Sequence, residues 1–133
     1  MKKDINIPEV KEVGIAIVRQ KEEEEFVWRV YLINFNSFLI KNVLISSRGY
    51  GSINDKKKKT SSFSHFLGDV DQKSCRPFEL LNEAVFGLSN EFLVTYYIDN
   101  IIYDKKYIFL PDSIQEKHFS NIPVLNKKGV LIK

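Results

Sequence analysis

Cysteine, histidine and tryptophan are scarce in this chain of 133 residues, which has one Cys, two His and one Trp. The single cysteine, Cys75, has no partner for an internal disulfide. It also stands too far along the chain from His65 and His118 to give the short ligand spacings of zinc sites. Asp69 and Asp71 could begin a calcium loop, but a lysine follows where a further oxygen ligand is needed. We therefore expect no metal and no cofactor.

Long hydrophobic runs are also missing. No segment approaches the roughly 18 apolar residues that cross a membrane. The segment from Met1 to Asn6 carries positive charge, but no apolar stretch of the length found in secretory signals follows it. We therefore expect a cytoplasmic protein that makes no contact with a membrane.

Complete catalytic motifs are absent as well. The segment Gly49-Tyr50-Gly51 begins like a phosphate-binding glycine loop, but Asn54 stands where the third glycine belongs. The segment Gly87-Leu88-Ser89 begins like a nucleophile elbow, but it lacks the last glycine of that motif. Only His65 and His118 could act as imidazole bases for a serine. The chain is therefore not expected to be an enzyme.

Hydrophobic residues are abundant and make up 44% of the chain. Aromatic residues alone account for 13%. The ten Phe and six Tyr favour pleated, half-buried surfaces. Val13–Val18 and Phe26–Asn34 predict two strands joined by an acidic loop, Lys21–Glu25. In the second strand, alternate residues form an inward apolar row made of Trp28, Val30 and Leu32.

Further strands are predicted along the rest of the chain, at Lys41–Ser47, Thr60–Leu67, Ser74–Leu81, Glu91–Ile98, Ile101–Leu110 and Val130–Ile132. The two residues Asp99 and Asn100 fit a type I′ turn, which requires positive φ. Ser113 and Glu116 have the spacing of a capping box and predict a short helix ending near Phe119. Residues 81–89 fit either a strand end or one or two helical turns. His65 alternates with Phe63 and Leu67 and is expected to be a partly buried, structural histidine.

About seven short strands with regularly spaced turns predict a mostly β fold, an immunoglobulin-like antiparallel β-sandwich with one short C-terminal helix. One domain is expected over residues 1–133. It comprises an extended lead-in at 1–12, the sandwich at 13–110, and the short helix and tail at 111–133.

The sequence resembles known domains in two respects. The run from Trp28 to Asn34, followed by Asn42–Ile45, resembles the core strands of small immunoglobulin-like sandwiches. The whole chain is also similar to a family of uncharacterised bacterial proteins of about this size, in the segments Ile7–Val10, Val30–Asn34, Ser47–Gly51, Phe86–Glu91 and Asn126–Val130. Members of that family sometimes carry the label of a phenylalanyl-tRNA synthetase alpha subunit. The resemblance implies a fold and no catalytic motif, and we expect no ATP–pyrophosphate exchange.

One strand face is predicted to need a cover. Arg29, Tyr31, Ile33 and Phe35 lie opposite the inward row of their strand, although a sandwich normally leaves one face of each sheet polar. The predicted helix, the tail, a protein partner or a second copy could cover them. A homodimer is slightly favoured.

The lysines at Lys56, Lys57, Lys58 and Lys59 form the only basic run, inside a predicted loop at Arg48–Lys59. Because loops of an antiparallel sandwich alternate between its ends, this loop and the acidic loop are expected at the same end, with Leu81–Asn90. The net charge of only +3 argues against nucleic acid as a partner. The leading hypothesis is thus a non-enzymatic protein-binding or structural module. The alternatives are an RNA-associated domain that uses the lysines, and a small enzyme with an unrecognised site.

Overall fold

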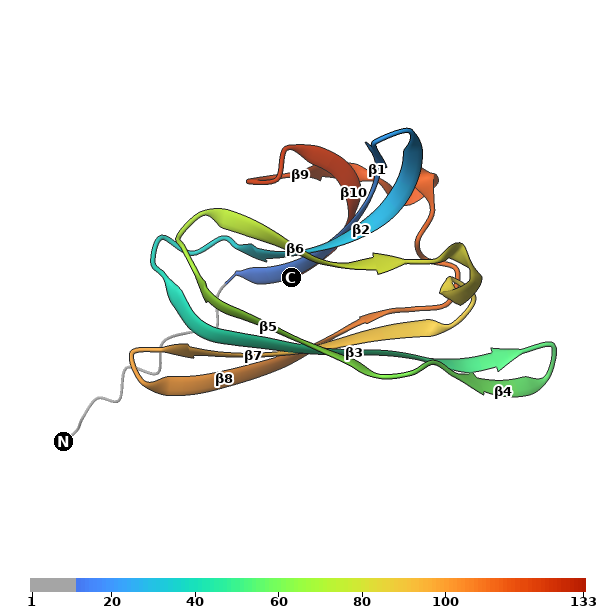
Figure 1. Cartoon of the computed structure of the whole chain (residues 1–133), viewed down its shortest axis with the longest axis horizontal. Coiled ribbons are helices and arrows are strands. Elements are labelled where there is room, and N and C mark those ends of the chain that lie inside the picture. The colour runs from blue at the N-terminus through green and yellow to red at the C-terminus, as the bar shows by residue number, and fades with distance from the viewer. Residues whose placement is uncertain (1–11) are drawn as a thin grey trace.

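A computed structural model describes residues 12–133 as two antiparallel sheets that pack face to face (Figure 1). The first sheet has the order β6-β2-β1-β10-β9, with β1 (Val13–Glu22), β2 (Glu25–Asn34), β6 (Ser74–Leu81), β9 (Ser120–Ile122) and β10 (Lys127–Ile132). The second has the order β4-β3-β7-β8, with β3 (Ile40–Ile53), β4 (Lys56–Lys59), β7 (Ser89–Ile98) and β8 (Ile101–Phe109); β5 (Phe63–Val70) also pairs with β3. Strands make up 67% of the described residues, which confirms a mostly β sandwich.

Turn residues with positive φ end the main hairpins. Asp99 and Asn100 have φ values of 49° and 65°, as the predicted turn between β7 and β8 requires. Asn54 and Asp55 do the same between β3 and β4, with φ values of 53° and 62°. Residues 48–59 therefore form a hairpin and not the predicted loop, because this Asx pair lets β3 continue to Ile53.

The core lies between the two sheets. Trp28, Val30 and Leu32 point into it, as the alternation in β2 predicts, and they meet Ile45, Phe92 and Tyr96 of the second sheet. The Trp28 ring packs edge-on against Phe86 and Phe119, with ring centroids 5.0 and 6.0 Å away. Gly129 lets β10 approach β1, because a Cβ there would overlap the Ile17 carbonyl oxygen.

A second, smaller core lies on the outer face of the first sheet. Its buried residues are Ala16, Val18, Tyr31, Ile33, Phe35 and Ile122. Val124, Leu125 and Leu131 pack against them, so the C-terminal tail covers this face. Figure 1 shows β9 and β10 curling over the end of this sheet.

Two details of the predicted architecture are wrong. The structure has ten strands and not seven, because β4 and β9 are short strands at sheet edges whose polar residues give no alternating pattern. The predicted helix at Ser113–Phe119 is only a 3₁₀ turn, η2 (Glu116–His118). The Ser113 hydroxyl donates to the Leu110 carbonyl and so does not cap a helix. A second 3₁₀ turn, η1 (Glu83–Val85), is capped by Asn82 and occupies the segment left open between strand and helix.

The acidic segment Lys21–Glu25 and the basic segment Lys56–Lys59, the two charge runs, lie on the same side of the molecule but do not neutralise one another. Figure 1 places the β1–β2 turn, the β3–β4 turn and η1 toward one end. Glu22 pairs with Arg29 of its own hairpin, with Nη2 and Oε1 2.5 Å apart. Within residues 12–133, Lys56–Lys59 make no ion pair, so they do not contact the glutamates of the β1–β2 turn in this way.

The extended lead-in predicted at 1–12 lies, except for its last residue, outside the described residues. In the part of the chain that the structure describes, no helix has the length and hydrophobicity needed to span a membrane.

Candidate ligand-binding pocket

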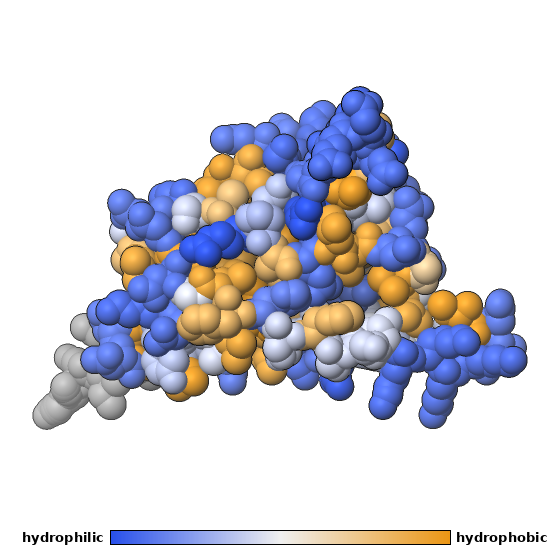
Figure 2. All heavy atoms as spheres, viewed as in Figure 1, coloured by the Kyte–Doolittle hydropathy of each residue, from blue (hydrophilic) through white to orange (hydrophobic). Residues whose placement is uncertain are grey.

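The sandwich is open along the side where β5 and β6 are the facing edges of the two sheets. A pocket of about 500 Å³ lies there between the sheets. Figure 2 shows hydrophobic side chains visible between the two layers on this side, among hydrophilic ones. Phe63, Phe78, Leu81, Val85 and Phe92 supply its apolar wall. The pocket therefore combines access from solvent with a core-like lining.

An irregularity in β6 brings a carboxylate into this apolar space. The register between β2 and β6 shifts after Val30, which leaves Phe78 as an extra residue between Pro77 and Glu79. In a regular strand, Phe78 and Glu79 would point to opposite faces; a bulge can aim both to one side. Phe78 packs against Phe92 with ring centroids 5.9 Å apart, and Glu79 reaches across to the second sheet.

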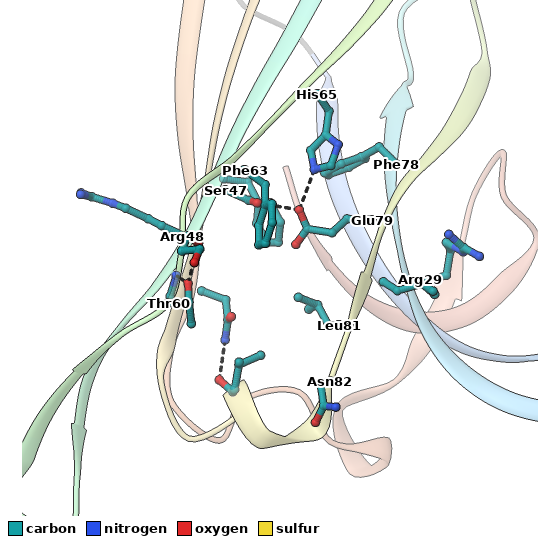
Figure 3. A pocket seen from close by; sticks show the side chains of 16 residues that line it. Arg29, Ser47, Arg48, Thr60, Phe63, His65, Phe78, Glu79, Leu81 and Asn82 are labelled. Atoms are coloured by element: carbon teal, nitrogen blue, oxygen red, sulfur yellow. Dashed lines mark hydrogen bonds and ion pairs between the residues drawn. The ribbon is translucent and has the colours of Figure 1, made fainter.

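Two side chains of the second sheet hold one oxygen of Glu79 (Figure 3). The Ser47 hydroxyl donates to Oε1 at 2.6 Å, and His65 Nε2 lies 2.8 Å from the same oxygen. The Glu79 side chain is 13% exposed and that of His65 is 26% exposed. The other oxygen, Oε2, has no protein partner among the described residues and faces the pocket in Figure 3.

The rim of the pocket is fixed by further polar contacts. Asn90 donates to the carbonyls of Val85 and Leu88 and so holds η1 against β7. Gly49 donates its backbone N–H to the Thr60 hydroxyl at 2.7 Å, which fastens the segment before β5 to β3. These bonds hold the walls of the pocket in place through contacts within the chain.

Sequence reasoning missed Ser47, Glu79 and Asn90. Strand positions of this kind look like ordinary polar residues, because nothing local shows that β5 and β6 face one another. One signal was available: Pro77 inside a predicted strand indicates an edge strand or a bulge, since proline has no N–H to donate. His65 was expected to be partly buried, and it is.

The predicted interaction face is mostly inaccessible. Tyr31, Ile33 and Phe35 are at most 7% exposed, beneath the C-terminal tail. Arg29 is hydrogen-bonded to Glu22. These hydrogen bonds raise the pKa of Arg29 and lower the pKa of Glu22. Of the alternatives that could cover this face, the structure supplies the tail.

The predicted basic patch is fully exposed but divided. Lys56–Lys59 form β4, where successive side chains point to opposite faces. Lys57 and Lys59 pair with Ser52 and Tyr50, whereas Lys56 and Lys58 pair with Ile53 and Gly51. Only two of the four lysines can therefore contact one flat ligand.

Two other residues singled out in the sequence have ordinary environments. Cys75 packs with the outer-face core, and burial raises the pKa of its thiol, which disfavours the reactive thiolate. The two glycines at 49 and 51 lie within β3, where Gly51 has a φ of 146°. No group of three or more potential metal ligands occurs between residues 12 and 133.

Comparisons of the chain with protein-family models, curated proteins and solved structures gave no match. The family resemblance noted from the sequence therefore stays a prediction.

Proposed function

We propose that this chain is a non-enzymatic binding module built on an immunoglobulin-like sandwich. The strand order supports the immunoglobulin-like assignment. Strands β1, β2 and β6 occupy the places of strands A, B and E, and β5, β3, β7 and β8 those of C′, C, F and G. Strands β9 and β10 are then an addition beside strand A, and β4 extends strand C′ as an arm.

The pocket is the proposed binding site, and its ligand is a basic side chain of a protein partner. The observation that carries this proposal is the Glu79 carboxylate, which has one oxygen fixed by Ser47 and His65 and the other facing an apolar, aromatic space. A lysine or arginine fits such a site, because its alkyl stem is apolar and its end is cationic. A charge-assisted hydrogen bond to the fixed carboxylate would be stronger than a neutral one.

The arrangement supports binding over catalysis. A serine nucleophile needs a histidine between its hydroxyl and the carboxylate. Here the carboxylate lies between Ser47 and His65, and no hydrogen bond joins the imidazole to the hydroxyl. Ser47 is also only 3% exposed, which shields it from a substrate.

Titration with butylammonium, an analogue of the lysine side chain, tests the proposal. We expect binding to shift the NMR signals of Phe63, Phe78 and His65. Glu79→Gln keeps the size of the side chain but removes its charge, and it should weaken binding by about tenfold or more. Glu24→Gln, in the exposed β1–β2 turn, is the matched control and should have no effect. Equal affinity of both variants, or equal affinity for butanol and butylammonium, would contradict the proposal.

RNA binding is the second candidate. Lys57 and Lys59 share the outer face of the second sheet with Arg48 and Tyr50, and the Arg48 guanidinium lies 5.3 Å from the Tyr50 ring centroid. Cations beside an aromatic ring suit a single-stranded nucleic acid, which stacks bases on such rings. Hydrophilic side chains project from this end of the molecule in Figure 2.

A further inference from the structure

The outer edge of β8 has no strand partner among the described residues. Strand β8 pairs with β7 along its whole length, and no other strand between residues 12 and 133 pairs with it. Ile98 and Ile101 flank the two-residue turn, so the backbone of Ile101 bonds toward β7. Backbone groups alternate along a strand, and those of Ile102, Asp104, Lys106 and Ile108 therefore point to the open edge.

The side chains of these four residues can match those of an identical strand that runs antiparallel to β8. If a second copy of β8 pairs antiparallel with Lys105 opposite Lys105, Ile102 meets Ile108 and Asp104 meets Lys106, each twice. All four side chains lie on the outer face of the sheet, in register with Tyr97, Thr95, Leu93 and Glu91 of β7. Ile102 is 56% exposed in the single chain, so the pairing would also remove apolar surface from water.

Neighbouring registers lack this match. A shift by one pair in either direction places Asp104 opposite Asp104 or Lys106 opposite Lys106, and like charges directly opposite one another are destabilising. Registers that differ from this one by an odd number of residues are excluded by the backbone. They would place residues whose backbone groups bond toward β7 opposite residues whose backbone groups point to the outer edge. One register therefore satisfies both the backbone and the charges.

Lys105 is the position that opposes pairing, because it faces its own copy at the two-fold axis. Its ammonium nitrogen lies 5.2 Å from the centroid of the Tyr107 ring, two residues farther along the same strand. The side chain of Lys105 thus points away from the two-fold axis, toward Tyr107 of its own chain. By symmetry, the lysine of the second copy points in the opposite direction. The repulsion is reduced by that separation.

We propose that two copies of this chain associate through β8, forming one continuous sheet across a two-fold axis at Lys105. This homodimer uses a different surface from Arg29, Tyr31, Ile33 and Phe35, which the tail covers. It also leaves the ligand pocket free, because β5 and β8 are opposite edges of the second sheet. The dimer and the pocket can therefore be tested separately.

Charge reversal at the predicted contacts tests the dimer. Asp104→Lys places two lysines opposite one another at both contacts, and Lys106→Asp places two aspartates there instead. Each variant alone should associate about tenfold or more weakly than the native chain. A mixture of the two variants should form a heterodimer, because a lysine then faces an aspartate at both contacts. One contact keeps the native pair of Asp104 and Lys106, and the other has the two residue types exchanged. Light scattering after size exclusion gives the masses, and thermal melting verifies that each variant is folded.

Glu24→Lys changes the net charge as much as Asp104→Lys but lies in the β1–β2 turn, so it should leave the dimer intact. A monomeric native chain at every measurable concentration would overturn the proposal and make Lys105 and Lys106 guards of a free edge. Equal loss of association in Glu24→Lys, or no dimer in the mixture of folded variants, would also overturn it.

The register has its own test. In a Cys75→Ser background, Lys105→Cys places two thiols across the axis, at a distance that a disulfide can span. We expect mild oxidation to give a covalent dimer at this position, and none for Glu24→Cys. Cross-linking through Glu24→Cys but not Lys105→Cys would contradict pairing through β8.

Discussion

At the scale of single residues, two buried tyrosines show how a hydroxyl can be costly or useful. Tyr96 and Tyr107 are both fully buried and lie on neighbouring strands. The Tyr107 hydroxyl donates to the Val13 carbonyl and ties the second sheet to the first. The Tyr96 hydroxyl has no hydrogen-bond partner among the described residues.

Removal of each hydroxyl should therefore have opposite effects. We expect Tyr96→Phe to leave the free energy of unfolding unchanged or raise it by about 1 kcal/mol, because an unpaired buried group is removed. Tyr107→Phe should lower it by about 1–3 kcal/mol, because the Val13 carbonyl loses its partner. Denaturant unfolding measures both variants. Equal destabilisation would show that Tyr96 has a partner in solution.

The Tyr96 hydroxyl makes the free energy of unfolding sensitive to alkaline pH. Burial raises the pKa of Tyr96 from 10.0 to about 12, so the folded chain retains a proton that the unfolded chain releases. Titration of this group does not change the free energy of unfolding below pH 10, and it lowers that free energy as the pH rises from 10 toward 12, by at most about 1.4 kcal/mol for each pH unit. Tyr96→Phe should flatten this decline in urea unfolding. An unchanged slope would contradict the shift.

At the scale of elements, the C-terminal tail acts as a cover that the sheet requires. Ile33 of β2 and Ile122 of β9 belong to the same small core. Ile33→Ala and Ile122→Ala should each cost about 2–5 kcal/mol, and the double variant should cost less than their sum because both open the same space. Leu110→Ala, at a residue 64% exposed, is the control and should change stability by less than about 0.5 kcal/mol. A neutral Ile122→Ala would mean that the tail is not docked.

Strand content followed from the sequence, but the pocket did not. The predicted strand at Ser74–Leu81 has the same ends as β6, since alternation and turn residues are local signals. The bulge at Phe78 depends on how β6 meets β2, and the use of Glu79 depends on Ser47 and His65, which are 32 and 14 residues away in the chain. Long-range contacts of this kind leave no periodicity in the sequence.

At the scale of the whole molecule, the sequence predicted two layers and the end at which the charge runs lie, but not their isolation from one another. Glu22 is neutralised within its own hairpin, and nothing in the described part of the chain neutralises the lysines of β4. The reason for the difference is geometric: the β3–β4 arm projects away from the β1–β2 turn in Figure 1. The lysines of the basic arm therefore have no ion-pair partner among the described residues.

The alternation in β4 makes a sharp test of whether RNA is that ligand. Lys57→Gln with Lys59→Gln removes the charges beside Tyr50, and Lys56→Gln with Lys58→Gln removes the same number from the opposite face. If RNA lies on the outer face of the second sheet, the first pair should weaken binding of a single-stranded oligonucleotide and reduce the salt dependence by roughly 0.7 for each lost phosphate contact. The second pair should leave both nearly unchanged. Equal weakening by the two pairs would indicate only non-specific attraction, and undetectable binding by the native chain in low salt would remove RNA as a candidate and leave the pocket as the functional surface.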